Sequence, residues 1–201
     1  MGFPKKLSFL RRQESIRNQY FYLMNLKQIF LFLLVVGSIG LLSFQLPKNL
    51  QKKVKKEIKT AFDVEVFSLE PIQISDTLNS QLKTKISGKN FYKILSDKNL
   101  LGYAFIDKAP SKVDMFDYLV LFDKDLIIKK AKVLIYREDY GGEIGSKRWL
   151  RQFIGKTTND KLIYKKDIIA ISGATISANS MTVAINNLLK TIRILHQNKA
   201  I

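Results

Sequence analysis

The sequence predicts an α+β fold, with an antiparallel or mixed sheet and a C-terminal helix, preceded by one N-terminal transmembrane helix. Three observations lead to this expectation. The middle of the chain contains successive β-branched and aromatic runs, the C-terminal part has apolar residues at helical spacing, and the N-terminal part has a long uncharged stretch. A chain of 201 residues is long enough for one domain of ordinary size with such an appendage.

The uncharged stretch is IFLFLLVVGSIGLLSFQL, residues 29–46. At roughly 1.5 Å per residue it is about the minimum that crosses a hydrocarbon core as a helix. A cleaved signal peptide is the alternative, but its apolar core is normally about 7–15 residues and ends at a small-residue cleavage site. Because this run is longer and is followed by PKNLQKKVKK, we expect a retained single-span anchor.

The net charge of +17 invites a nucleic-acid interpretation, so its distribution matters. The basic N-terminal segment, residues 1–28, holds six Lys or Arg against one acidic residue, and residues 47–62 hold six Lys against one, so these flanks supply +10 of the total. The excess charge therefore brackets the apolar run, and we expect the lipid bilayer as a partner and no nucleic acid. Because the two flanks are equally basic, charge does not choose the orientation.

Residues 47–84 are expected to form an amphipathic connector followed by a segment with weak signals. The apolar residues at its start lie four apart: Leu50, Val54, Ile58 and Phe62. This spacing predicts a short helix with a face of lysines, which either lies on anionic headgroups or docks its apolar stripe on the domain. From Val64 to Ser87 the sequence predicts little beyond a strand or two and a loop.

The middle of the chain is expected to form an antiparallel meander. Polar turns separate four β-branched and aromatic runs: NFYKIL, LLGYAFID, FDYLVLFD and LIIKKAKVLIY. The turn Asp123-Lys124-Asp125 joins the last two runs as a hairpin, and the meander ends near Tyr136. A further strand is expected at residues 163–171, which are rich in isoleucine.

The C-terminal part is expected to be a helix. Its apolar residues fall three and four apart: Met181, Ile185, Leu188, Ile192 and Leu195. Ser177, Asn179 or Ser180 can cap this helix. Just before it, the small residues of SGAT, Ser172 to Thr175, leave the backbone approachable, and amides at a helix N-terminus suit a phosphate.

A glycine-rich loop follows the meander and contains Gly141, Gly142 and Gly145. It is either a place where a flat ligand lies close to the backbone or a plain turn before a helix around Trp149. It is no dinucleotide fingerprint, because neither G-x-G-x-x-G nor G-x-x-x-x-G-K-[ST] occurs.

The composition limits the kinds of active centre. The chain has no cysteine, which excludes thiolate catalysis, Fe–S clusters and thiol-ligated zinc. The single histidine, His196, is expected on the last turn of the C-terminal helix rather than as a ligand. We therefore predict no catalytic side chain and no metal site.

Two segments resemble a known family. The pattern RE-x-x-GG…W-x-x-QF-x-GK at Arg137 to Lys156 and SGAT-x-S at Ser172 to Ser177 resemble the FMN-binding domain of the membrane-anchored flavoprotein subunits of the Rnf complex and of the sodium-translocating NADH:quinone oxidoreductase. The similarity covers roughly residues 85–195, within an expected FMN-binding domain at 85–201. In that family the last threonine of S/T-G-A-T carries FMN through a phosphoester bond, which a dedicated flavin transferase installs from FAD.

The resemblance implies that Thr175 is the attachment residue for covalent FMN. The cofactor-binding residues predicted around it are Ser172, Gly173, Ala174, Ser177, Glu138, Gly141 and Gly142, with Tyr140 and Trp149 as candidates to pack on the isoalloxazine ring. Both aromatic residues have the alternative of being ordinary core or surface side chains.

The sequence also departs from the family pattern. Asp139 and Tyr140 replace the Thr and Pro of an E-T-P-G pattern, and Ile169 stands where related sequences carry an aspartate, with Asp167 as the nearest acidic residue. These departures leave open whether the chain belongs to a Rnf-type or Nqr-type complex or stands alone.

The expected function is electron relay between redox partner proteins in a bacterial inner (cytoplasmic) membrane. The resemblance implies that a flavin transferase matures the protein and that the FMN domain faces outside the cytoplasm. A cofactor-free, membrane-anchored binding or assembly module is the alternative. The sequence does not identify the electron donor, the acceptor or the oligomeric state.

Overall fold

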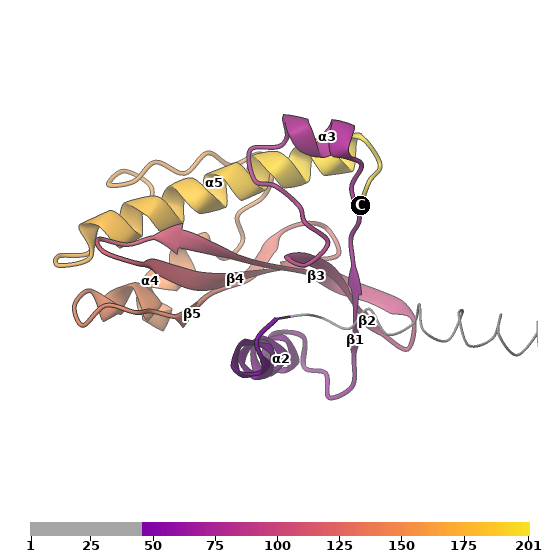
Figure 1. The fold of residues 1–201 in the computed structure, drawn as a ribbon, viewed down its shortest axis with the longest axis horizontal. Coiled ribbons are helices and arrows are strands. Elements are labelled where there is room, and N and C mark those ends of the chain that lie inside the picture. The colour runs from indigo at the N-terminus through magenta and orange to yellow at the C-terminus, as the bar shows by residue number, and fades with distance from the viewer. Residues whose placement is uncertain (1–45) are drawn as a thin grey trace, which may run out of the picture. The chain divides into compact units, whose positions relative to one another are not determined.

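A five-stranded antiparallel sheet forms the centre of the structure (Figure 1). The computed structural model describes residues 46–201. The strands follow one another in the sheet in chain order: β1 (Ser68–Pro71), β2 (Phe91–Ser96), β3 (Asn99–Pro110), β4 (Met115–Asp123) and β5 (Ile128–Ile135). The predicted α+β class and the antiparallel meander are confirmed, including the hairpin at Asp123, whose carbonyl and carboxylate accept bonds from the turn between β4 and β5.

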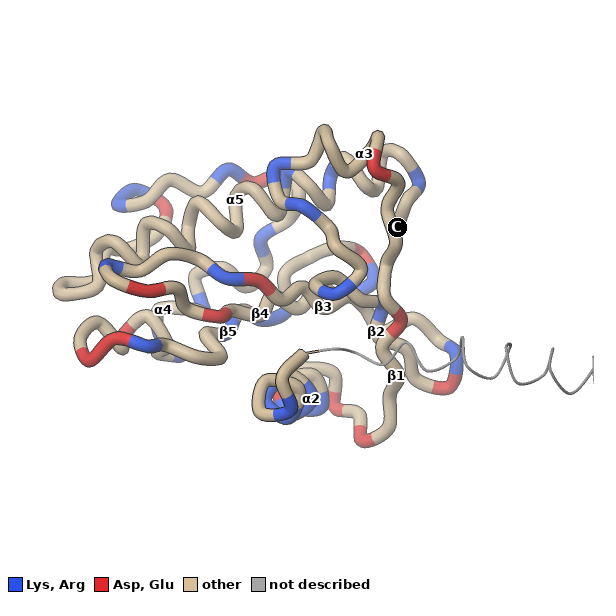
Figure 2. Tube along the Cα trace, viewed as in Figure 1, with Lys and Arg blue, Asp and Glu red and all other residues tan. Residues whose placement is uncertain are grey.

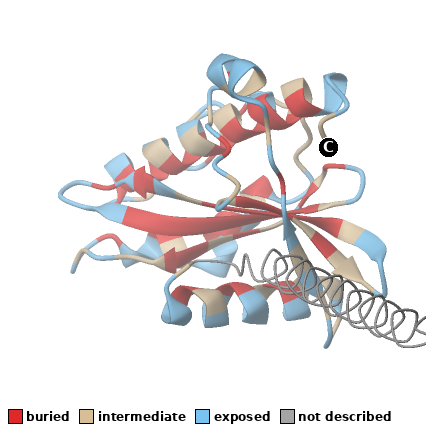
Figure 3. Ribbon diagram, turned by 45° about the vertical axis from the view of Figure 1, so that its right-hand side comes forward, coloured by how far each residue is buried: buried red, intermediate tan, exposed pale blue. Residues whose placement is uncertain are grey.

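Strands β3 and β4 are buried on both faces, so they appear in the sequence as largely continuous apolar runs. Alternate residues of a strand point to opposite faces of its sheet. On β4, Phe116 and Phe122 lie in the core on one face, whereas Leu119 and Leu121 lie in the core on the other. Figure 3 shows buried residues along both faces of the sheet and on the helix sides that cover them.

Helix α2 (Lys48–Phe62) covers one of these faces. Its Leu50, Val54 and Ile58 are buried and pack with residues of β2, β3 and β4. The predicted amphipathic helix is thus present, and its apolar stripe docks on the domain. The lysines of α2 are exposed, and Figure 2 marks lysine positions along this helix in blue.

Helix α5 (Thr175–Gln197) covers the other face (Figure 1). All five residues of its predicted apolar stripe are buried, from Met181 to Leu195. The predicted start was wrong, because the helix begins at Thr175 with Ala174 as its N-cap residue. Ser177 and Ala178 are buried, and the Ala178 amide donates to Ala174 O at 2.9 Å, so the small residues expected to precede the helix form its first turn.

The strand predicted at residues 163–171 does not form. This segment consists of turns with one isolated bridge between Tyr164 and Ile168. The Asp167 carboxylate accepts a bond from the Ile163 amide at 2.8 Å, which closes a local turn that competes with an extended strand. Ile168 is buried while Ile169 is exposed, so the isoleucines do not share one environment.

Short helices complete the described part. They are α3 (Asp76–Gln81), η1 (Gly142–Gly145), α4 (Lys147–Leu150) and η2 (Arg151–Phe153). The helix expected around Trp149 is therefore present. Within residues 46–201 no helix combines the length and apolar character needed to cross a bilayer. The basic segment at 1–28 and, except for Leu46, the anchor expected at 29–46 lie outside the described residues.

Candidate functional site

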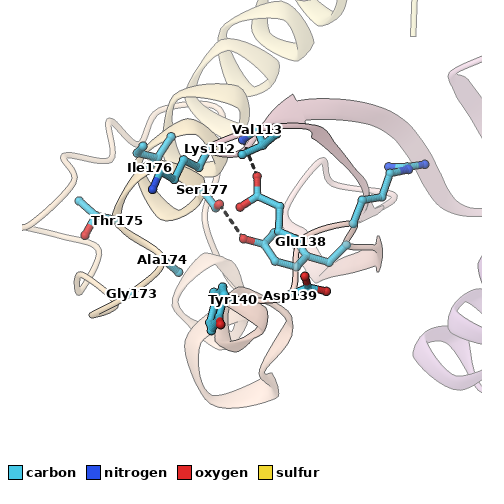
Figure 4. Close-up of a pocket in the computed structure, with 12 residues that line it drawn as sticks. Lys112, Val113, Glu138, Asp139, Tyr140, Gly173, Ala174, Thr175, Ile176 and Ser177 are labelled. Atoms are coloured by element: carbon cyan, nitrogen blue, oxygen red, sulfur yellow. Dashed lines mark hydrogen bonds between the residues drawn. The ribbon is translucent and has the colours of Figure 1, made fainter.

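The two sequence motifs lie together at the N-terminal end of α5, where they line a cavity of about 640 Å³ (Figure 4). The end of β5 and the loop after it form one side, the SGAT turn and first turn of α5 form another, and the turn between β3 and β4 closes the third. The lining residues are Lys112, Val113, Tyr136, Arg137, Glu138, Asp139, Tyr140, Gly173, Ala174, Thr175, Ile176 and Ser177.

Gly141 brings the two motifs into contact. Its φ of +83° lies in the left-handed region that glycine adopts readily. A Cβ atom at this position would lie 2.9 Å from the Tyr136 hydroxyl oxygen, 3.1 Å from the Ala174 Cβ and 3.1 Å from the Gly173 carbonyl oxygen. The loop therefore approaches the SGAT turn closely only because residue 141 is glycine. Gly142, which begins η1, is exposed and outside the cavity.

The SGAT sequence forms a tight turn that leads directly into α5. Gly173 has a φ of +79°, and the Ala174 amide donates to Ile171 O at 3.3 Å to close the turn. Ala174 is buried, whereas Ser172 and Gly173 are exposed. The turn thus anchors itself through Ala174 and leaves its other small residues open to solvent.

Thr175 is the first residue of α5 and its side chain is exposed. The hydroxyl donates to Ile171 O at 3.4 Å, a long contact. Thr175 is not the N-cap residue, and within residues 46–201 no side chain caps this helix. The first turn of α5 therefore presents amide groups and the positive end of the helix dipole beside a reachable hydroxyl. In Figure 4 the Thr175 side chain points away from Glu138 and lies at the edge of the cavity.

Ser177 supports the wall of the cavity from inside the helix. It is buried, and its Oγ lies 3.1 Å from the Tyr136 hydroxyl, the contact that Figure 4 marks with a dashed line. This hydrogen bond fixes Tyr136 between β5 and α5. The buried position makes the Ser177 hydroxyl inaccessible to a modifying enzyme.

Glu138 holds the turn between β3 and β4. Its Oε1 accepts bonds from Ser111 Oγ at 2.5 Å, from the Val113 amide at 2.7 Å and from the Asp114 amide at 3.3 Å. The Ser111 hydroxyl, followed by the Val113 amide, lowers the pKa of Glu138 below its usual value. The carboxylate stays ionised and keeps Lys112 and Val113 on the cavity.

Lys112 supplies positive charge to the cavity, whereas Arg137 does not. In Figure 4 the Lys112 side chain extends from its turn towards the first turn of α5. Arg137 points the other way, where its guanidinium donates to Asp117 Oδ2 at 2.5 Å and to Met115 O at 2.6 Å. An anion at the N-terminus of α5 would therefore meet the Lys112 ammonium group and the helix dipole.

Comparison with protein families gives a match over the segment that contains most of this site. Residues 113–190 match the family model described as FMN-binding domain. This segment belongs to the FMN-binding domain family. The match confirms the predicted resemblance and indicates a flavoprotein. No match was found among curated proteins.

The FMN-binding segment contains both aromatic residues predicted to pack on the ring, and the structure separates them. Tyr140 is 84% exposed and lines the cavity. Trp149 is buried outside the cavity, where its Nε1 donates to Ile169 O at 2.7 Å and its ring lies edge-on to Phe153 at 5.3 Å between centroids. Of the two alternatives for Trp149, the structure therefore shows core packing.

Of the departures from the family pattern, Asp139 and Tyr140 line the cavity, whereas Ile169 lies beside this tryptophan. Ile169 is exposed, and its carbonyl is fixed by the Trp149 indole. The Asp167 carboxylate is used by its own turn through the Ile163 amide. In this FMN-binding domain neither residue lines the cavity.

Sequence analysis did not identify Lys112, Val113, Tyr136 or Ile176 as residues of the site. Lys112 and Val113 were placed only in a turn between two strands. Their role depends on which end of the sheet meets the start of α5, and the antiparallel pairing of β3, β4 and β5 decides that. Ile176 shows no signal beyond its position next to SGAT.

Proposed function

We propose that this protein is a membrane-anchored flavoprotein that carries FMN covalently on Thr175 through a phosphoester bond and relays electrons between redox partners. One observation carries the proposal. The exposed Thr175 hydroxyl stands at an uncapped helix N-terminus, on the rim of a cavity lined mostly by the FMN-binding segment. The cavity volume of about 640 Å³ falls within the roughly 300–1,000 Å³ of small-molecule sites.

The attachment step is a phosphoryl transfer from FAD to Thr175. The Thr175 Oγ1 attacks the phosphorus atom that bears riboflavin, an Oγ1–P bond forms, and the bond from that phosphorus to the bridging oxygen breaks. AMP leaves with the bridging oxygen, and the hydroxyl proton passes to solvent. The partner that this step requires is a flavin transferase, because the chain itself offers only the nucleophile and its setting.

The first turn of α5 and Lys112 would hold the phosphate. A phosphodiester keeps one negative charge, which about half a positive charge at a helix N-terminus stabilises. The Lys112 side chain extends towards the same turn. Glu138 contributes indirectly, since it fixes the turn that carries Lys112.

Exposed apolar side chains around the cavity suit a flat aromatic ligand. Val113 is 86% exposed, Tyr140 84% and Ile176 52%, and all three line the cavity. Covering them would remove apolar area from water at about 25 cal/mol per Å². Gly141 itself is buried and does not line the cavity, and its close approach to Gly173 and Ala174 instead holds the glycine loop against the SGAT turn.

Electron relay follows from the chemistry that FMN supplies when bound, because it accepts electrons in pairs or singly. Among residues 46–201 no group of His, Cys, Asp or Glu is arranged to hold a metal ion. We propose that the uncharged run at 29–46 anchors the protein in a bacterial cytoplasmic membrane and that the FMN domain faces outward, towards redox partners in or on that membrane.

The function is tested on the full chain, co-expressed with a flavin transferase. We expect the membrane fraction to keep the protein after an alkaline carbonate wash and the denatured protein to fluoresce on a gel under ultraviolet light. Release of the protein by the wash would contradict the proposed membrane anchor at residues 29–46. A non-fluorescent band in the presence of an active transferase would favour the cofactor-free anchored module.

A further inference from the structure

A second cavity lies on the other side of the described structure, between α2, β5 and the α4–η2 segment. Its volume is about 730 Å³, and it shares no lining residue with the cavity at the N-terminal end of α5. We call it the basic groove and define it by the charged residues that line it: Lys56, Glu57, Lys130, Lys132, Lys147 and Arg151.

The basic groove carries more positive charge than the described fold neutralises. Its five basic residues and one acidic residue give a net charge of +4. Lys130 Nζ pairs with Glu57 Oε2 at 2.5 Å. The other four basic side chains have no carboxylate partner within residues 46–201. Folding has thus gathered like charges from four elements without internal compensation.

The floor of the basic groove is apolar. Ala131 and Leu150 are buried in it, and Ile154 is 46% exposed at its edge. A charged rim over an apolar floor matches a protein segment that offers both carboxylates and apolar side chains. A bare inorganic anion would use the rim alone.

A membrane surface matches the basic groove less well. An interfacial helix binds a bilayer by burying its apolar face among the headgroups. The apolar stripe of α2, from Leu50 to Ile58, is already buried against the sheet. In addition, the groove is a hollow, whereas a bilayer presents an extended surface.

We propose that the basic groove binds an acidic, amphipathic segment of a partner protein. The proposal does not depend on covalent FMN, because the two cavities share no residue. Carboxylates of the partner would pair with Lys132, Lys147 and Arg151, and its apolar residues would contact Leu150 and Ile154. Charge of this kind speeds association and is weakened by salt.

The test uses the full chain in nanodiscs of phosphatidylcholine. The probe is a labelled amphipathic helical peptide with Glu on one face and Leu on the other. The groove variant is Lys132→Glu/Lys147→Glu/Arg151→Glu. The control variant is Lys83→Glu/Lys161→Glu/Lys190→Glu, which changes the total charge equally at exposed lysines outside the groove. We expect the groove variant to weaken peptide binding by about tenfold or more and the control by about twofold or less.

Two further measurements keep the outcome decisive. Zero-length carbodiimide cross-linking should join peptide carboxylates to Lys132 and Lys147 and not to Lys83 or Lys190. A second variant replaces the Glu variant if that variant unfolds. It is Lys132→Gln/Lys147→Gln/Arg151→Gln, which removes the charges without reversing them, and it should also weaken peptide binding. Equal weakening in the groove and control variants would overturn the proposal, because net charge alone would then explain binding. So would groove-dependent binding to phosphatidylglycerol vesicles with no binding of the peptide.

Discussion

The two faces of the sheet differ in what they bury and in what they leave exposed. The α5 face has the larger core, rich in aromatic rings such as Phe105, Phe116 and Phe122. The α2 face has a smaller core, mostly aliphatic, and a surface of lysines. The cavity at the N-terminal end of α5 lies at the end of the first face, and the basic groove lies beside the second. The sheet thus separates two features. On the α5 side a well-packed core holds the cavity in place, and on the α2 side the exposed lysines give a positively charged surface.

The largest expected effect of this difference is on stability. Ile185→Ala on the α5 face should lower the free energy of unfolding by about 2–5 kcal/mol, because it empties space in the larger core. Ile58→Ala is on the α2 face, where the side chain is equally buried. It should instead let α2 detach from the sheet in a local opening that precedes global unfolding. Hydrogen exchange of the full chain measures both effects. Loss of protection over the whole sheet in the Ile58 variant would show that the two faces form one cooperative unit.

The next effect concerns Arg137, which joins the two faces. It lines the cavity at the N-terminal end of α5, while its guanidinium pairs with the buried carboxylate of Asp117. Arg137→Ala leaves that carboxylate unpaired and should cost about 2 kcal/mol, below the 3–5 kcal/mol of a fully buried pair because Arg137 is partly exposed. Arg151→Ala, at an exposed site without a carboxylate partner among residues 46–201, should change stability by less than about 0.5 kcal/mol in chemical denaturation. Equal costs would contradict a structural role for Arg137.

A smaller, local effect is expected at Glu138. Hydrogen bonds from Ser111 and Val113 lower its pKa below the usual 4.5, so the stability that it contributes is present above pH 4.5 and is lost as the pH falls through the lowered pKa. Protonation should free the turn that carries Lys112 without unfolding the sheet. The amide signals of Val113 and Asp114 should therefore shift together on acid titration.

The matched variant is Glu138→Gln, which removes the charge at every pH. Its Val113 and Asp114 signals should resemble those of the acidified wild type already at pH 7. Wild-type signals that do not move between pH 5 and about 3 would show that another group holds the turn.

The sequence predicted those parts of the fold in which local pattern and tertiary burial agree. The β4 run from Tyr118 to Phe122 has buried apolar residues on both faces because both faces are covered, and the stripe of α5 is buried as its spacing indicates. The prediction was wrong at residues 163–171, where the isoleucines favoured a strand but the Asp167 carboxylate closes a turn. The predicted start of α5 is also too late, because Ser177 belongs to the first helical turn and does not precede the helix as a cap.

The candidate site was predictable only in part for a similar reason. Thr175 and Gly141 were identified because each lies within a short motif that can be recognised in the sequence. Lys112 is separated from both by a hairpin and reaches the cavity through the pairing of β3 with β4. Trp149 lies near the glycine loop in sequence, yet its indole is committed to the Ile169 carbonyl in the core. Closeness in sequence therefore failed to predict the site in two ways: it missed Lys112, which lines the cavity, and it included Trp149, which does not.

The most direct test of the account is to locate the flavin by peptide mass spectrometry. Wild type and Thr175→Ala are co-expressed with a flavin transferase, with Ser177→Ala as the control because its hydroxyl is buried and two residues away. The Thr175 change should cost less than about 0.5 kcal/mol of stability, since the side chain is exposed and is not the N-cap residue. The account predicts that the wild-type peptide containing SGATIS carries the mass of FMN less one water, that the Ser177 variant does the same, and that the Thr175 variant folds without it. Covalent flavin retained in Thr175→Ala would contradict the account.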